Sequence, residues 1–163
     1  MSRDPAKAGA DLRRLLLEAK PADFHLAPTP ELPNVWAAMM EMRVNKARVS
    51  IVAVAEGSTS MYFDPGGAVI GGGEHASVRD ANRKFLALVE QFFAARAFVA
   101  RDAPLDTPNG AVAFAVFTYS GFAVARDTEE RLKSKKSPIW PLFFMGHEVI
   151  AALREVNEKQ GGG

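Results

Sequence analysis

The chain has 163 residues, of which 48% are hydrophobic and 24% charged, and it contains no cysteine. This composition is typical of a globular domain, and the lack of cysteine excludes disulfides, thiol catalysis and cysteine-based zinc sites. The 20 basic and 19 acidic residues leave a formal charge of +1, which provides no overall field to attract nucleic acid or an anionic membrane. No apolar run has the pattern of a signal peptide or reaches the roughly 18 residues of a membrane span. We therefore expect a cytoplasmic protein with no membrane partner and, from its alanine content, a bacterial one.

The N-terminal part of the chain predicts two helices joined by a proline-rich connector. Leucines on one helical face predict a short amphipathic helix over residues 6–19. Four prolines between residues 21 and 33 favour an extended segment, because proline does not continue a helix and restricts the residue before it. Asn34 is suited to cap a second helix over residues 35–43.

The remainder of the chain predicts five strands and two further helices. Alternating and β-branched runs separated by turn residues such as Asp64–Gly67 are typical of antiparallel hairpins. Apolar residues at spacings of three and four predict a long helix over residues 77–98 and a last helix starting near Pro141. The predicted strands are residues 49–54, 58–63, 68–70, 111–118 and 122–126.

Together these elements predict an α+β fold: one domain with an antiparallel sheet of about five strands, flanked by helices. The predicted divisions are an N-terminal helix and connector (1–33), the α+β domain (34–158) and a flexible tail (159–163). This element order resembles the small roadblock, longin and profilin-like modules, in which helices flank a central antiparallel sheet.

A second resemblance lies in four short segments. Pro33–Trp36, Thr59–Phe63, Gly66–His75 and Trp140–Phe144 are similar to a family of small bacterial proteins without assigned function. The resemblance implies no activity, substrate or catalytic residue.

The glycine-rich turn before the long helix is the strongest local motif. Backbone N–H groups of Gly71, Gly72 and Gly73, with Ser77 and Arg79 of the first helical turns, form a candidate anion or ligand site at a helix N-terminus. The dinucleotide-binding fingerprint is absent, and the glycine spacings of a P-loop that begin at Gly66 and Gly67 are not followed by the lysine and the serine or threonine of that motif. The alternative interpretation is a structural turn, with the glycines forming a bulge or a close packing contact.

Histidines and carboxylates suggest a metal or acid–base site less strongly. Glu74–His75 precedes the long helix and His147–Glu148 lies on the last one. Neighbours on a helix point about 100° apart, so His147 and Glu148 do not suit one ion. We predict no metal site, no cofactor and no catalytic residue.

A basic segment precedes an aromatic cluster near the last helix. Arg131, Lys133, Lys135 and Lys136 come shortly before Trp140, a combination that in other proteins binds single-stranded nucleic acid. The balanced net charge argues against that interpretation and favours a solvated surface.

Trp36, Met39 and Met40 on the predicted second helix are candidates for a subunit interface, since methionine-rich surfaces adapt to partners. With no catalytic signature, we predict a non-catalytic protein-interaction module, an adaptor or scaffold that forms a homodimer, whose protein partner the sequence does not identify. The alternative is a regulatory domain that binds a small ligand or nucleotide at residues 71–77.

Overall fold

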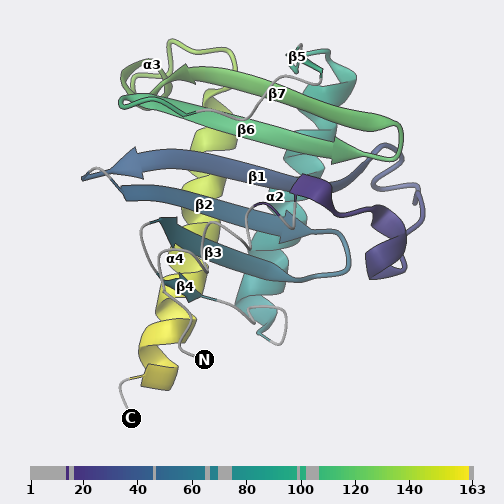
Figure 1. The fold of residues 1–163 in the computed structure, drawn as a ribbon, viewed down its shortest axis with the longest axis horizontal. Helices are drawn as coiled ribbons and strands as arrows, with labels where there is room; N and C mark the ends of the chain where they lie inside the picture. Colours follow the sequence, from purple (N-terminus) through teal and green to yellow (C-terminus); the bar gives the residue numbers. More distant parts are fainter. Residues whose placement is uncertain are drawn as a thin grey trace.

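The computed structural model describes residues 14, 17–45, 47–64, 67–69, 75–98, 100–101 and 107–161. Its elements in chain order are η1 (Pro21–Phe24), β1 (Val35–Val44), β2 (Ala47–Val54), β3 (Thr59–Asp64), β4 (Ala68–Val69), α2 (Ala76–Ala94), β5 (Ala100–Arg101), β6 (Ala111–Thr118), β7 (Gly121–Thr128), α3 (Glu129–Lys133) and α4 (Trp140–Gly161). The strands form one antiparallel sheet in the order β4-β3-β2-β1-β6-β7-β5. The two long helices, α2 and α4, lie side by side across one face of this sheet (Figure 1).

The predicted α+β class is confirmed, and all five predicted strands are present as β2, β3, β4, β6 and β7. The sheet has two further strands. One is the two-residue β5, which pairs with β7. The other is β1, the central strand of the sheet, which hydrogen-bonds to both β2 and β6.

The predicted helix over residues 35–43 is wrong, because this segment is the strand β1. Every side chain from Val35 to Met42 is buried. A central strand covered on both faces carries apolar residues at successive positions, so the period-two signal of a half-exposed strand disappears. Without that signal, a run of alanine and methionine resembles a helix.

The larger core lies between the sheet and the helices. Phe85, Leu86 and Val89 of α2 pack with strand side chains such as Met40 and Phe114. This confirms the apolar stripe predicted for the long helix, although α2 ends at Ala94 rather than at residue 98.

Helix α4 approaches the sheet closely at Gly146. A Cβ added at Gly146 would overlap the thioether end of Met40, which is completely buried. The glycine therefore lets α4 pack directly on the central strand.

Two buried polar side chains join α2 to the ends of the strands. The Asn82 amide donates to the carbonyl oxygens of Val54 (3.2 Å) and Ser58 (3.0 Å) and to Thr59 Oγ1 (2.8 Å), beside the β2–β3 turn. At the other end of the helix, the Glu90 carboxylate accepts hydrogen bonds from the backbone N–H groups of Asn34 (2.7 Å) and Val35 (3.1 Å). These contacts hold the helix at both ends.

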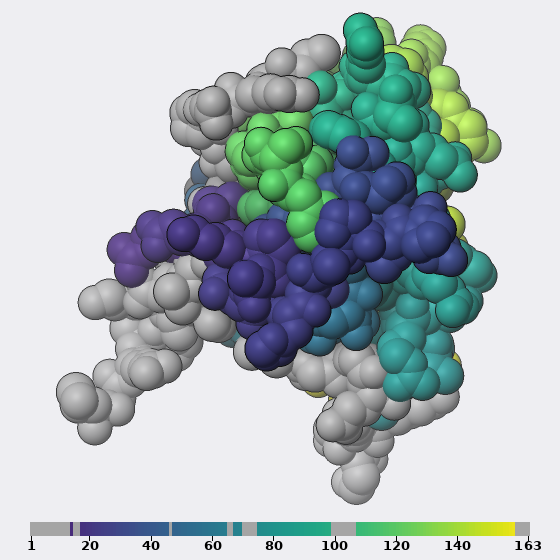
Figure 2. Space-filling model, turned by 90° about the vertical axis from the view of Figure 1, so that its right-hand side faces the viewer, coloured from purple at the N-terminus to yellow at the C-terminus, as the bar shows by residue number. Residues whose placement is uncertain are grey.

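The opposite face of the sheet carries a smaller apolar cluster, which the N-terminal segment covers. Phe24 packs on Trp36 with ring centroids 5.8 Å apart, and Trp36 packs on Phe117 at 5.5 Å. Leu17 and Leu26 pack against the same cluster. Figure 2 shows this segment, purple to blue, against the green hairpin of β6 and β7. The predicted helix over residues 6–19 lies largely outside the described residues; Arg14, Leu17 and Glu18 are helical.

Two further differences concern the C-terminal part. The sequence predicts no helix between the strand that ends at residue 126 and the last helix, but the structure has the short helix α3 there, which Thr128 caps by accepting from the Arg131 N–H. Helix α4 begins at Trp140 and continues to Gly161, so residues 159–161 of the expected tail are helical. The helices among the described residues include none long and apolar enough to cross a membrane.

Candidate functional site

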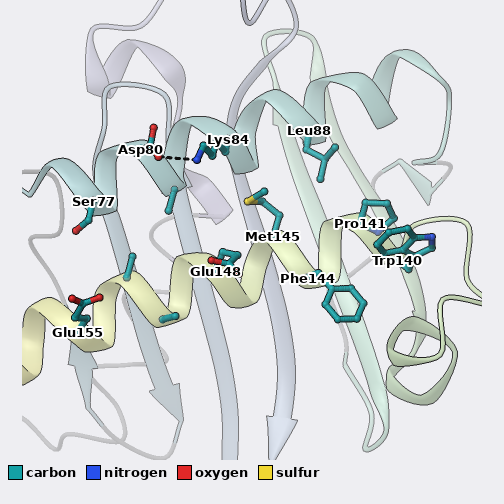
Figure 3. A pocket seen from close by; sticks show the side chains of 13 residues that line it. Ser77, Asp80, Lys84, Leu88, Trp140, Pro141, Phe144, Met145, Glu148 and Glu155 are labelled. Carbon is teal, nitrogen blue, oxygen red and sulfur yellow. Dashed lines mark ion pairs between the residues drawn. The ribbon is translucent and has the colours of Figure 1, made fainter.

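An open groove lies between α2 and α4, on the side of the helices away from the sheet (Figure 3). Its volume is about 730 Å³. Both helices contribute to it, and its floor is largely apolar. The residues that line it are Ser77, Asp80, Ala81, Lys84, Leu88, Trp140, Pro141, Phe144, Met145, Glu148, Ala151, Ala152 and Glu155. We refer to these residues as the α2/α4 groove.

The two ends of the α2/α4 groove differ in chemistry. Because α2 and α4 run in opposite directions, the start of each helix lies beside the later part of the other (Figure 3). One end joins Leu88 of α2 to Trp140 and Phe144 at the start of α4. The other end joins Ser77 near the start of α2 to Glu155 on the last turns of α4. We call these the aromatic end and the acidic end.

A lysine from the α3–α4 turn covers the aromatic end. The Lys135 ammonium lies 4.7 Å from the ring centroid of Trp140 and 5.7 Å from that of Phe144. Such cation–π contacts place a positive charge directly on the aromatic surface. The Phe144 ring is nevertheless 40% exposed and, with Val44 (47%), one of two large hydrophobic residues exposed in the described part of the chain.

Acidic side chains dominate the rest of the rim. Asp80 forms ion pairs with Lys84 (2.9 Å) and Arg83 (3.0 Å). Hydrogen bonds from Lys84 and then Arg83 lower the pKa of Asp80 below its ordinary value, so this carboxyl is ionised at neutral pH. Glu148 and Glu155 add two further carboxylates from α4. The basic residue among those that line the groove is Lys84.

Only part of the anion site predicted from the sequence lies within the described residues. Gly71, Gly72 and Gly73 lie outside the described residues. Ser77 lines the α2/α4 groove. Arg79 lies instead beside the β2–β3 turn, where its side-chain carbons are 3.9 and 4.0 Å from the position of a Cβ on Gly57. The structure therefore does not bring the Ser77 and Arg79 side chains together, and the anion site stays a prediction.

The residues that the sequence suggests for a subunit interface are buried within the fold. Trp36 is 2% exposed, and Met39 and Met40 are completely buried. Trp36 and Met39 belong to the cluster under the N-terminal segment, whereas Met40 lies under the helices. An interface at these residues stays a prediction, one that would require their intramolecular cover to move.

His147, on α4, packs edge-on against the Phe143 ring with centroids 4.5 Å apart. Burial lowers the pKa of His147 below its ordinary value, while the charge of Glu129 on α3 raises it. No group of three or more histidine and carboxylate side chains suited to a metal ion occurs within the described ranges.

The basic segment does not form one continuous positive surface. Arg131 pairs with Asp127 at 3.0 Å and Lys133 with Glu129 at 3.0 Å. Lys135 lies over the aromatic end of the groove. These ion pairs favour the solvated-surface interpretation over a nucleic-acid site.

A polar cluster on the opposite face of the sheet is the other notable arrangement. The fully buried Glu41 carboxylate accepts hydrogen bonds from Ser50 Oγ and Thr107 Oγ1, both at 2.8 Å. Nearby, Arg48 pairs with Asp64 at 2.7 Å, and the Arg48 Nε is buried without a hydrogen-bond partner in the described part. Since hydroxyl donors satisfy Glu41, we interpret this cluster as part of the sheet's own packing.

Sequence reasoning missed the α2/α4 groove, although a signal for it exists. Trp140, Phe144, Glu148, Ala152 and Glu155 recur at spacings of three and four along α4. This second stripe lies beside the stripe that packs on the sheet. A helix with two such stripes indicates a second packing surface, but only the position of α2 shows that the stripe borders a groove.

No family model matches the chain, and no match was found among curated proteins or solved structures. The two resemblances of the sequence therefore stay predictions.

Proposed function

We propose that this chain is a non-catalytic protein-interaction module, an adaptor or scaffold, that binds an apolar helical segment of a partner protein in the α2/α4 groove. The observation that carries the proposal is the apolar lining of the groove, in which Phe144 is exposed and Trp140 and Met145 beside it are half-buried. Exposed apolar patches rimmed by polar residues are typical of protein-binding surfaces.

The shape of the groove favours a peptide segment over a small molecule. Small-molecule sites are usually enclosed and carry a few convergent polar groups. Here the floor is formed by side chains of two long, antiparallel helices, and the charged groups Asp80, Lys84 and Glu148 lie along the rim (Figure 3). An amphipathic helix laid along such a groove buries its apolar face and keeps its polar face in water.

Selection from a displayed library of amphipathic helical peptides tests this proposal. We expect wild-type protein to enrich peptides whose affinity falls by at least about tenfold in Phe144→Glu, because the new charge would be desolvated under the bound helix. Val44→Glu is the matched control, since it makes the same type of change at an exposed hydrophobic residue at the end of β1.

Methionine methyl spectra then locate the bound peptide. Met145 lines the groove, whereas Met39 is buried on the opposite face of the sheet. We expect the peptide to shift the Met145 signal and leave the Met39 signal unchanged. Failure to enrich any peptide that distinguishes Phe144→Glu from Val44→Glu would refute the proposed function.

A further inference from the structure

We infer that the occupant of the α2/α4 groove is the same groove of a second copy of this chain, with the two α4 helices antiparallel across a two-fold axis. This inference rests on the proposed function, since it names the partner of the same surface. In a two-fold pair, each surface meets its own counterpart in reverse order. The aromatic end of each copy therefore faces the acidic end of the other.

The side-chain sizes of the two ends fit this arrangement. Trp140 and Phe144 provide bulk at the aromatic end, and Phe144 projects far enough to be 40% exposed. At the acidic end, Ala81, Ala151 and Ala152 leave the space between the helices unfilled. An antiparallel partner places its aromatic side chains over these alanines, and the same contact forms twice.

The charges at the two ends of the groove fit the same arrangement, whereas Glu148, midway between them on α4, meets its own counterpart near the two-fold axis and opposes pairing. Lys135 lies over the aromatic end of the groove, and Glu155 lies at the acidic end. Antiparallel pairing brings Lys135 of each copy toward Glu155 of the other. A parallel arrangement would instead place the two lysines together and the two glutamates together, which is unfavourable.

The size of the groove predicts a weak dimer. Stable interfaces bury about 800 Å² per partner, with roughly 20–30 residues on each side. The groove is lined by 13 residues, so we expect dissociation constants in the range of micromolar to hundreds of micromolar.

Analytical ultracentrifugation from about 5 µM to about 1 mM covers this range. We expect concentration-dependent dimerisation of wild type and Val44→Glu, weakened about a hundredfold in Phe144→Glu because a charge would be buried in each of the two aromatic contacts. The Met145 methyl signal should follow the dimer fraction while the Met39 signal does not. Circular dichroism establishes that each variant is folded.

Charge reversal tests the antiparallel arrangement itself. Lys135→Glu places two glutamate pairs in its own dimer, and Glu155→Lys places two lysine pairs in its own, so each alone should dissociate about tenfold more readily at low salt. An equimolar mixture of the two variants forms both opposite-charge contacts. Its association should therefore return to the wild-type level and weaken as salt is added.

Three results would overturn the inference: a monomer at every concentration, a dimer whose formation leaves Met145 unchanged, or a mixture that associates no better than its components. Failure of the dimer inference can be distinguished from failure of the proposed function by peptide selections at protein concentrations below the dimer dissociation constant. If the groove binds peptides through Phe144 while the chain stays monomeric, the module recognises a different protein and only the self-pairing is wrong.

Discussion

The central strands β1, β2 and β6 are buried on both faces of the sheet, but very different structures cover the two faces. On one face, α2 and α4 pack as continuous helices over the larger apolar cluster. On the other, the described cover is the segment from Leu17 to Leu26, with one 3-10 turn, Pro21–Phe24, lying on Trp36 and its neighbours. The burial of the strands therefore does not by itself show how strongly the two helices, or the N-terminal segment, are bound to the sheet.

Hydrogen bonding shows the same difference within the described residues. Asn82 and Glu90 join α2 to the strand ends at both ends of the helix. On the opposite face, the buried polar contacts of Glu41 with Ser50 and Thr107 lie within the sheet and the segment just before β6. We therefore expect the helical face to supply most of the stability and the N-terminal cover a smaller, separable part.

The largest expected effect is a direct test of this comparison. Phe85→Ala, at a completely buried site on the helical face, should lower the free energy of unfolding by about 4 kcal/mol, because it removes an aromatic ring and leaves a cavity. Phe24→Ala, at a half-buried site of the N-terminal cover, should lower it by about 1 kcal/mol.

Urea denaturation followed by circular dichroism measures both changes. The Phe24→Ala protein should also show increased hydrogen exchange in β6 and β7 near Phe117 and Phe122, because Phe24 packs on the same cluster. Equal destabilisation by the two variants would show that the two faces are equally important.

A smaller effect is expected where α4 touches the central strand. Gly146→Leu should lower the free energy of unfolding by about 3 kcal/mol, because its side chain would occupy the space of the buried Met40 thioether. Gly146→Ala is the control. Its single methyl group overlaps only the end of the buried Met40 side chain, and a gain in helix propensity of about 1 kcal/mol offsets part of that cost, so it should destabilise the protein less than Gly146→Leu does.

Differential scanning calorimetry of the two Gly146 variants checks this expectation. A Gly146→Leu protein as stable as wild type would mean that α4 can move away from Met40, and that the helical cover is less tightly packed than the contact indicates.

The smallest effect is a pH dependence on the outer side of α4. Burial lowers the pKa of His147 below its ordinary value of 6.5, so the neutral ring is favoured in the folded state. The stability that the neutral His147 ring contributes is complete at pH values above the pKa of His147 in the unfolded state. It is lost as the pH falls below that value and through the pKa of His147 in the folded state. His147→Gln should therefore remove part of the loss of stability on acidification.

NMR titration of the His147 ring provides the direct measurement, assigned by comparison with His147→Gln. Glu129→Gln should lower the pKa of His147 further, because the charge of Glu129 raises it, and Lys133→Gln should have the opposite effect. A His147 pKa at or above 6.5 would show that burial does not govern the titration of this ring.

Much of the fold could be predicted from local patterns, but the groove could not. The stripe of Val78, Ala81 and Phe85 on α2 identified a helix packed on a core, and it is buried as expected. Trp140 and Phe144 were recognised as an aromatic cluster, but not as part of a groove. Their partners across it, such as Leu88 and Asp80, are more than 50 positions away in the sequence. No local spacing relates residues so far apart.

By itself, the sequence determined the α+β class, the hairpins and the positions of the long helices, because side-chain periodicity and turn chemistry are local properties. Tertiary structure decided that residues 35–44 form the central strand rather than a helix. Once a strand is covered on both faces, burial selects apolar residues at every position and removes the local signal. Tertiary structure also decided which helix stripes face the sheet and which form the α2/α4 groove, since that depends on how two helices distant in the sequence pack on one surface.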